Sequence, residues 1–271
     1  MAWQVTKFSV QVMGILNVTP DSFSDGGRFH ASDKALQHVE QMLSEGADII
    51  DVGGESTRPG AASVPVQEEL DRVIPVITAI RERFDVALSV DTSKPDVMRA
   101  AVSAGADLIN DVCALQQPGA LATCAGLLVP VCLMHMQGQP RTMQQAPDYD
   151  DVVQDISQFF QERIAACLAA GIVRQHLILD PGFGFGKTLS HNVDLLRRLT
   201  AFSDLELPIL VGLSRKSMIG TLLDNRSLEG RLHGSVAGAV IAAMHGANIV
   251  RVHDVGATVD ALKIVKAVMN K

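Results

Sequence analysis

Three segments of the chain repeat one pattern, in which a glycine precedes a short apolar run that ends in polar residues. They are GADIIDVGGE at 46–55, GADLINDV at 105–112 and GANIVRVHD at 246–254. The first follows a stretch in which Leu36, Val39, Met42 and Leu43 recur at helical spacing. Glycine suits the position after a helix because a positive φ costs it little. The repeat therefore predicts helices that end at a glycine and lead directly into strands.

Looser copies of the pattern bring the number of strand candidates to eight. These copies are VMGILNVT (12–19), ALSVDTSK (87–94), PVCLMHM (130–136), HLILDPG (176–182) and ILVGLSRK (209–216). Continuously apolar strands are typical of parallel sheets covered on both faces by helices, and 271 residues suit one barrel. We therefore predict an α/β fold, a single (β/α)8 TIM barrel over residues 1–271, with a doubly wound sheet as the alternative.

Charge and cysteine usage restrict the environment and the partners. The net charge of −7 creates no field that would attract nucleic acid or an anionic membrane. The longest apolar stretch, VAGAVIAAM, is too short to span a bilayer. The four cysteines form no C-x-x-C pair, which is typical of thiols in a reducing compartment. We expect a cytoplasmic protein that binds neither nucleic acid nor membranes.

The segment HLILDPGFGFGKT at 176–188 resembles a phosphate-binding loop. In the pattern G-x-x-x-x-G-K-[ST], however, the first glycine would fall on Pro181, which has no N–H to donate. The even spacing of Gly182, Gly184 and Gly186 also fails the dinucleotide pattern G-x-G-x-x-G. The pattern therefore disfavours a nucleotide hydrolase, and we expect Lys187 to be a solvated side chain at the start of a helix.

Polar residues stand at the end of almost every strand candidate, where a parallel barrel builds its active site. They include Asn17, Asp51, Asp91, Asn110, Asp180, Lys216, Arg251 and His253. Single positions have ordinary alternatives, since Asp91 could cap a helix, Asn110 could satisfy loop backbone and Arg251 could pair with a helix. Convergence on one barrel mouth is what predicts a functional site.

The residue types suggest what such a site would hold. Carboxylates with an Asn and a Lys, and no Ser-His or Cys-His pair, favour hydrogen bonding to a flat, nitrogen-rich ring. Across the mouth, Asn17, Arg58, Arg251 and His253 are suited to a metal-complexed anion such as diphosphate. A planar heterocycle with a diphosphate leaving group satisfies both halves.

Seven segments resemble the successive motifs of the dihydropteroate synthase family, in the family's order and across residues 13–254. They are MGILNVTPDSFSDGG, DVGGESTRPGA, SVDTSK, INDV, LDPGFGFGK, VGLSRKSMIG and RVHD. The resemblance implies a barrel transferase of folate biosynthesis and a sulfonamide target. Its reaction joins 6-hydroxymethyl-7,8-dihydropterin diphosphate to p-aminobenzoate and releases 7,8-dihydropteroate and diphosphate. The resemblance also implies Mg²⁺ as cofactor, a homodimer and small-molecule substrates.

The resemblance also implies a role for individual residues. Asp91, Asn110, Asp180 and Lys216 would hold the pterin, and Asp91, Asp180 and Lys216 would form the catalytic set. Asn17 would bind Mg²⁺, while Arg251 and His253 would bind the diphosphate. The p-aminobenzoate pocket would be formed, together with Lys216, by Thr57, Arg58, Pro59, Phe185 and Ser217.

No residue is an obvious nucleophile, so we expect positioning and charge stabilisation to dominate catalysis. If diphosphate left before the amine attacked, Asp91 and Asp180 could stabilise the pterin cation. Three rival functions are considered, one of them the nucleotide hydrolase, which would need a glycine where Pro181 stands. A pterin-dependent methyltransferase barrel would share the ring-binding residues but use no diphosphate, and a non-catalytic barrel would bind pterin without turnover.

Overall fold

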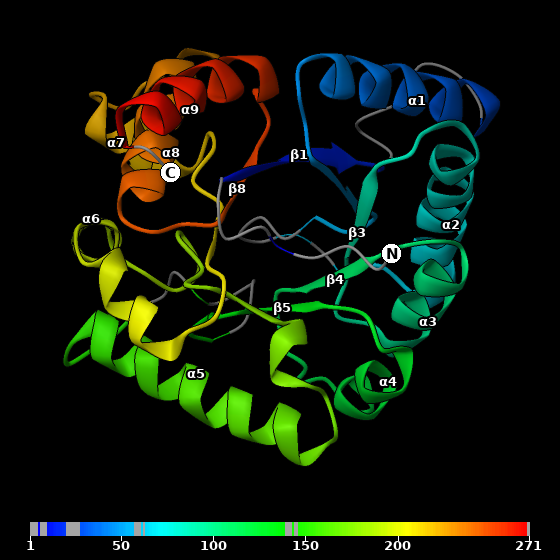
Figure 1. Ribbon diagram of the computed structural model, residues 1–271, viewed down its shortest axis with the longest axis horizontal. Helices are drawn as coiled ribbons and strands as arrows, with labels where there is room; N and C mark the ends of the chain where they lie inside the picture. The colour runs from blue at the N-terminus through cyan, green and yellow to red at the C-terminus, as the bar shows by residue number, and fades with distance from the viewer. Residues whose placement is uncertain are drawn as a thin grey trace.

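Eight parallel strands form the centre of the molecule (Figure 1). The computed structural model describes residues 5, 10–19, 28–56, 61, 63–138, 143 and 146–269, with the backbone alone for 28–32. The strands are β1 (Gln11–Asn17), β2 (Ile49–Gly53), β3 (Ala87–Asp91), β4 (Leu108–Asp111), β5 (Val131–Met134), β6 (Leu177–Asp180), β7 (Leu210–Val211) and β8 (Ile249–Val252). Each lies within or overlaps one strand candidate of the sequence, so all eight are confirmed.

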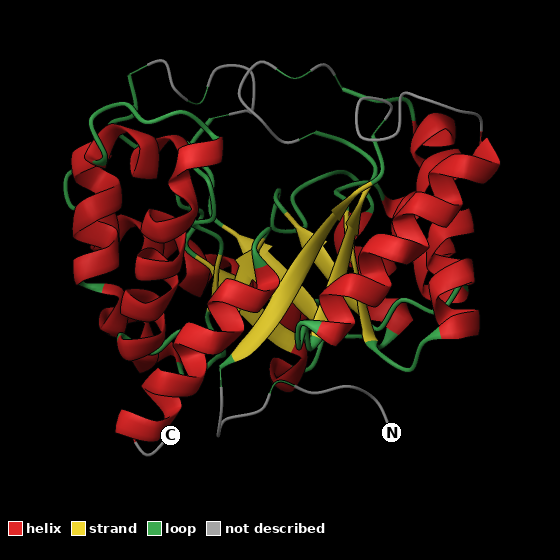
Figure 2. Ribbon diagram, turned by 90° about the horizontal axis from the view of Figure 1, so that it is seen from above, coloured by secondary structure: helices red, strands yellow, loops and turns green. Residues whose placement is uncertain are grey.

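Helices alternate with the strands and surround them, as Figures 1 and 2 show from two directions. The α-helices are α1 (Arg28–Ser44), α2 (Val66–Arg83), α3 (Pro95–Ser103), α4 (Ala120–Leu127), α5 (Val152–Ala169), α6 (Leu189–Arg197), α7 (Ser217–Leu222), α8 (Leu232–Met244) and α9 (Val255–Met269). Short 3-10 helices are η2 (Arg174–His176), η3 (Leu199–Leu205) and η4 (Glu229–Arg231).

The strand order distinguishes the barrel from the doubly wound alternative. Neighbouring strands follow the order β6-β5-β4-β3-β2-β1-β8-β7, with parallel pairing throughout. A parallel bridge between Leu179 and Ile209 then joins β6 to the start of β7. Consecutive strands are therefore neighbours all the way round, and the predicted (β/α)8 barrel is confirmed.

Two apolar cores lie on the two faces of the barrel wall. The larger one packs outward-facing strand residues such as Leu88, Val90 and Leu179 against the helices. The smaller one fills the barrel interior with Met13, Ile49, Leu108, Cys132, Ile178, Leu210 and Ile249. Because successive side chains of a strand point to opposite faces, strands with two covered faces must be apolar almost throughout.

A polar layer lies above this inner apolar layer, toward the carboxyl ends of the strands. Residues two positions apart share a face of a strand, and on four strands the second one is polar: Asp51 after Ile49, Asn110 after Leu108, Asp180 after Ile178 and Arg251 after Ile249. The sequence thus places a set of polar side chains inside the barrel directly over an apolar plug.

The repeated Gly-Ala-Asp/Asn segments have one structural role at the other end of the barrel. Gly46, Gly105 and Gly246 all have positive φ values of 99–112°. The Asp or Asn two positions after each glycine then forms two hydrogen bonds with a residue near the start of the adjacent strand. Asp48 donates its N–H to the carbonyl of Val12, and its Oδ2 accepts the N–H of Val12 at 2.8 Å. The repeat therefore aligns neighbouring strands.

The same pair of hydrogen bonds recurs in the other two copies of the repeat. Asp107 pairs with Leu88, whose N–H lies 2.9 Å from Asp107 Oδ2. Asn248 pairs with Ile209 in the same way, with the side-chain oxygen Oδ1 as acceptor at 2.9 Å. An amide oxygen can thus replace a carboxylate oxygen in this role.

Two further observations concern the whole chain. All four cysteines are free thiols. In the described residues, no helix is both long enough and apolar enough to cross a bilayer.

The Asn248 copy predicts how Asp48 tolerates substitution. Asp48→Asn keeps an acceptor for the N–H of Val12 and should change the free energy of unfolding by less than about 0.5 kcal/mol. Asp48→Ala removes that acceptor and should cost about 1 kcal/mol. Urea denaturation of both variants is the measurement, and equal losses would show that the side-chain hydrogen bond contributes nothing.

Candidate active site

A partly buried arginine between two carboxylates forms the floor of the barrel mouth. Arg251 Nε lies 2.6 Å from Asp51 Oδ2, and Nη2 lies 2.8 Å from Asp91 Oδ2. These residues come from β8, β2 and β3, so the ion pairs cross the interior of the barrel. Arg251 therefore pairs with strands across the barrel, and not with a helix. Asp91 binds this guanidinium instead of capping α3.

Asn110 belongs to the same network. Its Nδ2 donates to Asp51 Oδ2 at 3.2 Å, and the side chain is buried. Because the amide nitrogen is turned toward Asp51, the amide oxygen Oδ1 is left for another donor. Asp51 thus orients both Asn110 and Arg251. No role was predicted for Asp51, although an acidic residue inside the apolar run IIDV was a usable signal.

Asp180 ends β6 and faces the glycine-rich turn that follows. Its Oδ1 accepts the N–H of Gly182 at 2.8 Å. Gly182 has φ of +70°, and a methyl group in its place would lie 1.9 Å from the carbonyl oxygen of His135. Glycine is required here because the turn passes directly against the backbone after β5.

Lys216, between β7 and α7, is fixed by this turn. Its Nζ donates to the carbonyl of Phe183 at 2.6 Å and lies 4.5 Å from the centre of the Phe185 ring. Gly212 makes room for the arrangement, since a methyl group there would lie 3.9 Å from Lys216 Nζ and 3.8 Å from Arg251 Cβ. Lys216, Phe185 and Arg251 are therefore brought to the same side of the mouth.

The prediction for Lys187 was wrong. The side chain is only 3% exposed, and its Nζ contacts Nδ1 of His135 and the carbonyls of Gly182 and Phe185. Helix α6 begins after Thr188, whose side chain caps it, so Lys187 precedes the helix and turns inward. The physical reason is that the glycine turn directs carbonyl oxygens toward its own centre, where an ammonium can satisfy them.

His253 follows β8 and is held by Ser214. The Ser214 hydroxyl lies 3.1 Å from both the backbone N–H and the ring Nδ1 of His253. It accepts from the N–H, and donation to Nδ1 would leave the ring proton on Nε2. Ser217, the first residue of α7, is exposed. Sequence reasoning did not find the contact between Ser214 and His253.

Asn17 ends β1 beside Asp91. A methyl group at Gly53 would lie 3.7 Å from Asn17 Oδ1 and 3.8 Å from Asp91 Oδ2, so both oxygens border the same glycine. The described residues contain no group of three or more His, Cys, Asp or Glu that could hold a metal ion. A single amide oxygen nevertheless fits Mg²⁺, which keeps several waters and commonly binds substrate phosphates.

Thr57, Arg58 and Pro59 lie outside the described residues. Their predicted part in the site therefore stays a prediction.

A cavity of about 630 Å³ opens beside Asp91, a size typical of small-molecule sites. It extends over the ends of β3, β4 and β5, where Thr92, Val112 and Met134 line it. Asp180 and Lys216 are not among the lining residues, so the cavity meets the polar floor at Asp91.

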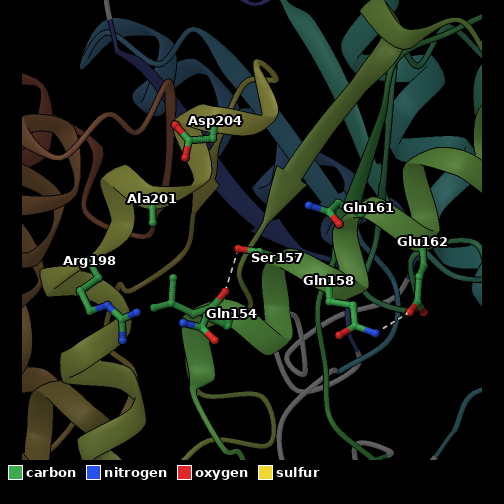
Figure 3. Close-up of a pocket in the computed structure, with 9 residues that line it drawn as sticks. Gln154, Ser157, Gln158, Gln161, Glu162, Arg198, Ala201 and Asp204 are labelled. Atoms are coloured by element: carbon green, nitrogen blue, oxygen red, sulfur yellow. Dashed lines mark hydrogen bonds between the residues drawn. The ribbon is translucent and has the colours of Figure 1, made fainter.

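A second groove lies away from the strand ends, on the outer helices (Figure 3). It runs between α5 and η3, with Gln154, Ser157, Arg198 and Asp204 among its lining residues. Ser157 and Gln158 bond within α5, to the Val153 carbonyl and to Glu162. The groove lacks the buried ionisable groups of the barrel mouth, and we place the active site at the mouth.

Burial shifts the acids and bases of the floor in opposite directions. It raises the pKa of Asp91 and of Asp180 above the usual range of a carboxyl group, although the nearby cations act in the opposite direction. It lowers the pKa of Lys216 to about 8, against the effect of Asp180. Burial also lowers the pKa of Arg251, but Asp51 and Asp91 more than offset this and raise it overall. The Cys132 thiol below the floor has a pKa well above its usual range because it is buried.

Together these features define a (β/α)8-barrel enzyme with a desolvated, acceptor-rich floor and two cations at its mouth. The family described as "Pterin binding enzyme" matches residues 13–253. Over 259 residues the chain is 60% identical to the dihydropteroate synthase of Escherichia coli (strain K12), covering 96% of this chain and 92% of the relative. The chain therefore belongs to the pterin-binding enzyme family.

Two solved structures agree with this assignment. The Yersinia pestis dihydropteroate synthase with sulfonamide drug complex is 61% identical, with a TM-score of 0.93 over 97% of this chain and 95% of that one. The dihydropteroate synthase from Xanthomonas albilineans in complex with 7,8-dihydropteroate is 51% identical, with a TM-score of 0.89 over 98% and 96%.

The shifted pKa predicts how the contribution of Lys216 depends on pH. Below about pH 8 the folded protein holds Lys216 as a charged donor, and above it as a neutral amine. A charged donor contributes about 1.5–3 kcal/mol and a neutral one about 0.5–1.5 kcal/mol. The ratio of kcat/KM between the wild type and Lys216→Met should therefore shrink as pH rises through 8. A ratio that stays constant from pH 7 to about pH 9.5 would count against this role.

Proposed function

We infer that the chain is a transferase that condenses 6-hydroxymethyl-7,8-dihydropterin diphosphate with p-aminobenzoate, which yields 7,8-dihydropteroate and diphosphate in folate biosynthesis. The observation that carries this is the acceptor-rich floor inside the barrel of a pterin-binding family member. The identity to dihydropteroate synthases over nearly the whole chain supports it.

Ring binding is proposed for Asp91, Asn110, Asp180 and Lys216. The carboxylates and the Asn110 amide oxygen would accept from ring N–H donors, while Lys216 would donate to a ring nitrogen or carbonyl. The support is that Asp51 turns the Asn110 nitrogen away, so that an acceptor remains.

The chemical step forms a bond between the arylamine nitrogen and the pterin methylene carbon, and breaks the bond from that carbon to the diphosphate oxygen. The amine loses its proton in the process. Positive charge develops on the pterin as the diphosphate leaves, and the Asp91 and Asp180 carboxylates are placed to stabilise it. The order of bond breaking and attack is part of this proposal.

The leaving group would be bound at the other side of the mouth. Asn17 would hold Mg²⁺, which when bound neutralises charge on the diphosphate. His253 would donate from Nε2, and Arg251 would add positive charge from the floor. Support comes from Asn17 Oδ1 lying close to Gly53 and from Ser214 fixing the His253 ring.

For p-aminobenzoate we propose a pocket formed by Phe185, Lys216 and Ser217, with Thr57, Arg58 and Pro59 completing it. The contact of the Lys216 ammonium with the Phe185 ring supports the first part, since the two together offer an aromatic face and a cation for a carboxylate.

We also propose a homodimer located in the cytoplasm. Exposed apolar side chains on adjacent helices favour association through one face: Ile241 and Met244 on α8, with Ile264 and Val268 on α9. The free thiols favour a reducing compartment.

Diphosphate release is the test of the function. The purified chain should release diphosphate only when both substrates and Mg²⁺ are present, with 7,8-dihydropteroate formed in equal amount. Asp180→Ala should lower kcat/KM by about ten- to a hundredfold, because it removes a charged acceptor from the pterin. Pterin binding without turnover would instead indicate a non-catalytic barrel, and turnover without diphosphate a methyltransferase.

Removing His253 should affect the diphosphate ester selectively. His253→Ala should weaken binding of the pterin diphosphate about tenfold while leaving the pterin alcohol nearly unchanged, because the imidazole would contact only the anion. Isothermal titration with both ligands measures this. Equal losses would place His253 elsewhere. Arg251 is unsuitable for this test, since its loss would leave Asp51 and Asp91 buried without their cation.

A further inference from the structure

The glycine-rich turn encloses the ammonium group of Lys187. Its Nζ lies 2.9 Å from the carbonyl oxygen of Gly182 and 3.0 Å from that of Phe185. His135 Nδ1, on the neighbouring strand end, lies 3.0 Å away. The side chain is buried, so the protein itself must satisfy these polar groups.

The geometry matches a protonated lysine. An ammonium has three N–H donors, and three acceptors lie 2.9–3.0 Å from Nζ, with the carbonyl oxygen of His135 farther away at 3.5 Å. Burial and the charge of Lys187 lower the pKa of His135 to about 2, so the imidazole is neutral and can accept at Nδ1. This is the reverse of a phosphate-binding loop: backbone carbonyls enclose a cation instead of N–H groups enclosing an anion.

The same turn holds two groups of the active site. The carbonyl of Phe183 accepts from Lys216, and the Phe185 ring packs against the same ammonium. Gly182 and Phe185, which bond to Lys187, therefore bracket the residue that binds Lys216. A shift of the turn would move both Lys216 and the Phe185 ring.

The turn has other attachments through its N–H groups and its last carbonyl. The N–H of Gly182 bonds to Asp180, the N–H of Gly184 bonds to Asn192 Oδ1 at 2.7 Å, and the carbonyl of Gly186 accepts from the Tyr149 hydroxyl at 2.7 Å. Without Lys187 these anchors would remain, and the carbonyls between them would lose their common donor. The expected consequence is a displaced turn within an intact barrel.

We propose that Lys187 is a positioning residue of the active site, which fixes the turn 182–186 and thereby sets the place of Phe185 and Lys216 for p-aminobenzoate. This inference rests on the proposed function. Of the four groups proposed for the pterin, Asp91, Asn110 and Asp180 belong to β3, β4 and β6, and only Lys216 is held by the turn. Both Phe185 and Lys216 are proposed for p-aminobenzoate, so loss of Lys187 should affect p-aminobenzoate more than pterin.

The test compares Lys187→Met with the wild type at about pH 6.5, where a lysine whose pKa burial lowers to about 7 is mostly protonated. The KM for p-aminobenzoate should rise roughly fivefold or more, while the dissociation constant of a free pterin changes by less than about threefold. Two controls are matched to it. Lys263→Met removes an exposed lysine, and Ile80→Ala creates a buried defect on α2.

The outcomes separate the two proposals. A wild type without diphosphate release contradicts the function itself. With an active wild type, an unchanged KM for p-aminobenzoate in Lys187→Met overturns the positioning role. The positioning role is also overturned if Ile80→Ala, at a loss of thermal stability equal to that of Lys187→Met, shows the same rise in the KM for p-aminobenzoate. If Lys187→Met does not fold, His135→Leu decides, because it removes one acceptor of the ammonium and leaves Lys187 in place. A rise in KM of about twofold or more supports the role, and no rise overturns it.

Discussion

The ion pairs of Arg251 with Asp51 and Asp91 are the constraint on which the site depends. A guanidinium inside a barrel would cost several kcal/mol if it were unpaired, and here two carboxylates pair with it. Arg251 holds Asp91 at the edge of the cavity, and Asp51 Oδ2, which accepts from Arg251, also accepts from Asn110 and orients it. Asp91 and Asn110, the two groups on this side that we propose to bind the ring, are thus positioned by neighbouring side chains before a ligand binds.

The layering of the barrel explains why this cluster of charged residues is accessible from one end of the barrel. An apolar layer of side chains closes the barrel beneath it, so the polar groups can be reached only from the carboxyl ends of the strands. Alternation along each strand connects the two layers, because Ile49 and Asp51, or Ile178 and Asp180, share a face. The position of the site is in this sense a consequence of the strand pattern.

Much of this could be predicted from the sequence. Strand positions followed from the apolar runs and the glycines before them, and the polar strand ends indicated Asp91, Asn110, Asp180 and Lys216. Partners were harder to predict. Whether Asp91 caps a helix or binds Arg251 depends on which strands face each other across the barrel. That is determined by how the sheet closes into a barrel and not by local spacing in the sequence.

Lys187 shows a second limit of sequence reasoning. A lysine after a turn is ordinarily solvated, and nothing in its immediate neighbours indicates otherwise. Its burial depends on the direction of the carbonyl oxygens of Gly182 and Phe185, and on His135 from a strand about fifty residues away. The binding and catalytic roles of all the predicted site residues stay predictions, including those of Thr57, Arg58, Pro59 and Asn17.

The contact of Lys216 with the Phe183 carbonyl and the Phe185 ring has a consequence for affinity. A free lysine side chain samples many rotamers, and immobilising it costs about 2 kcal/mol. Here folding has already met that cost, because the ammonium is held before any ligand arrives. Substrate then enters a preorganised pocket, and more of its interaction energy remains available for binding and catalysis.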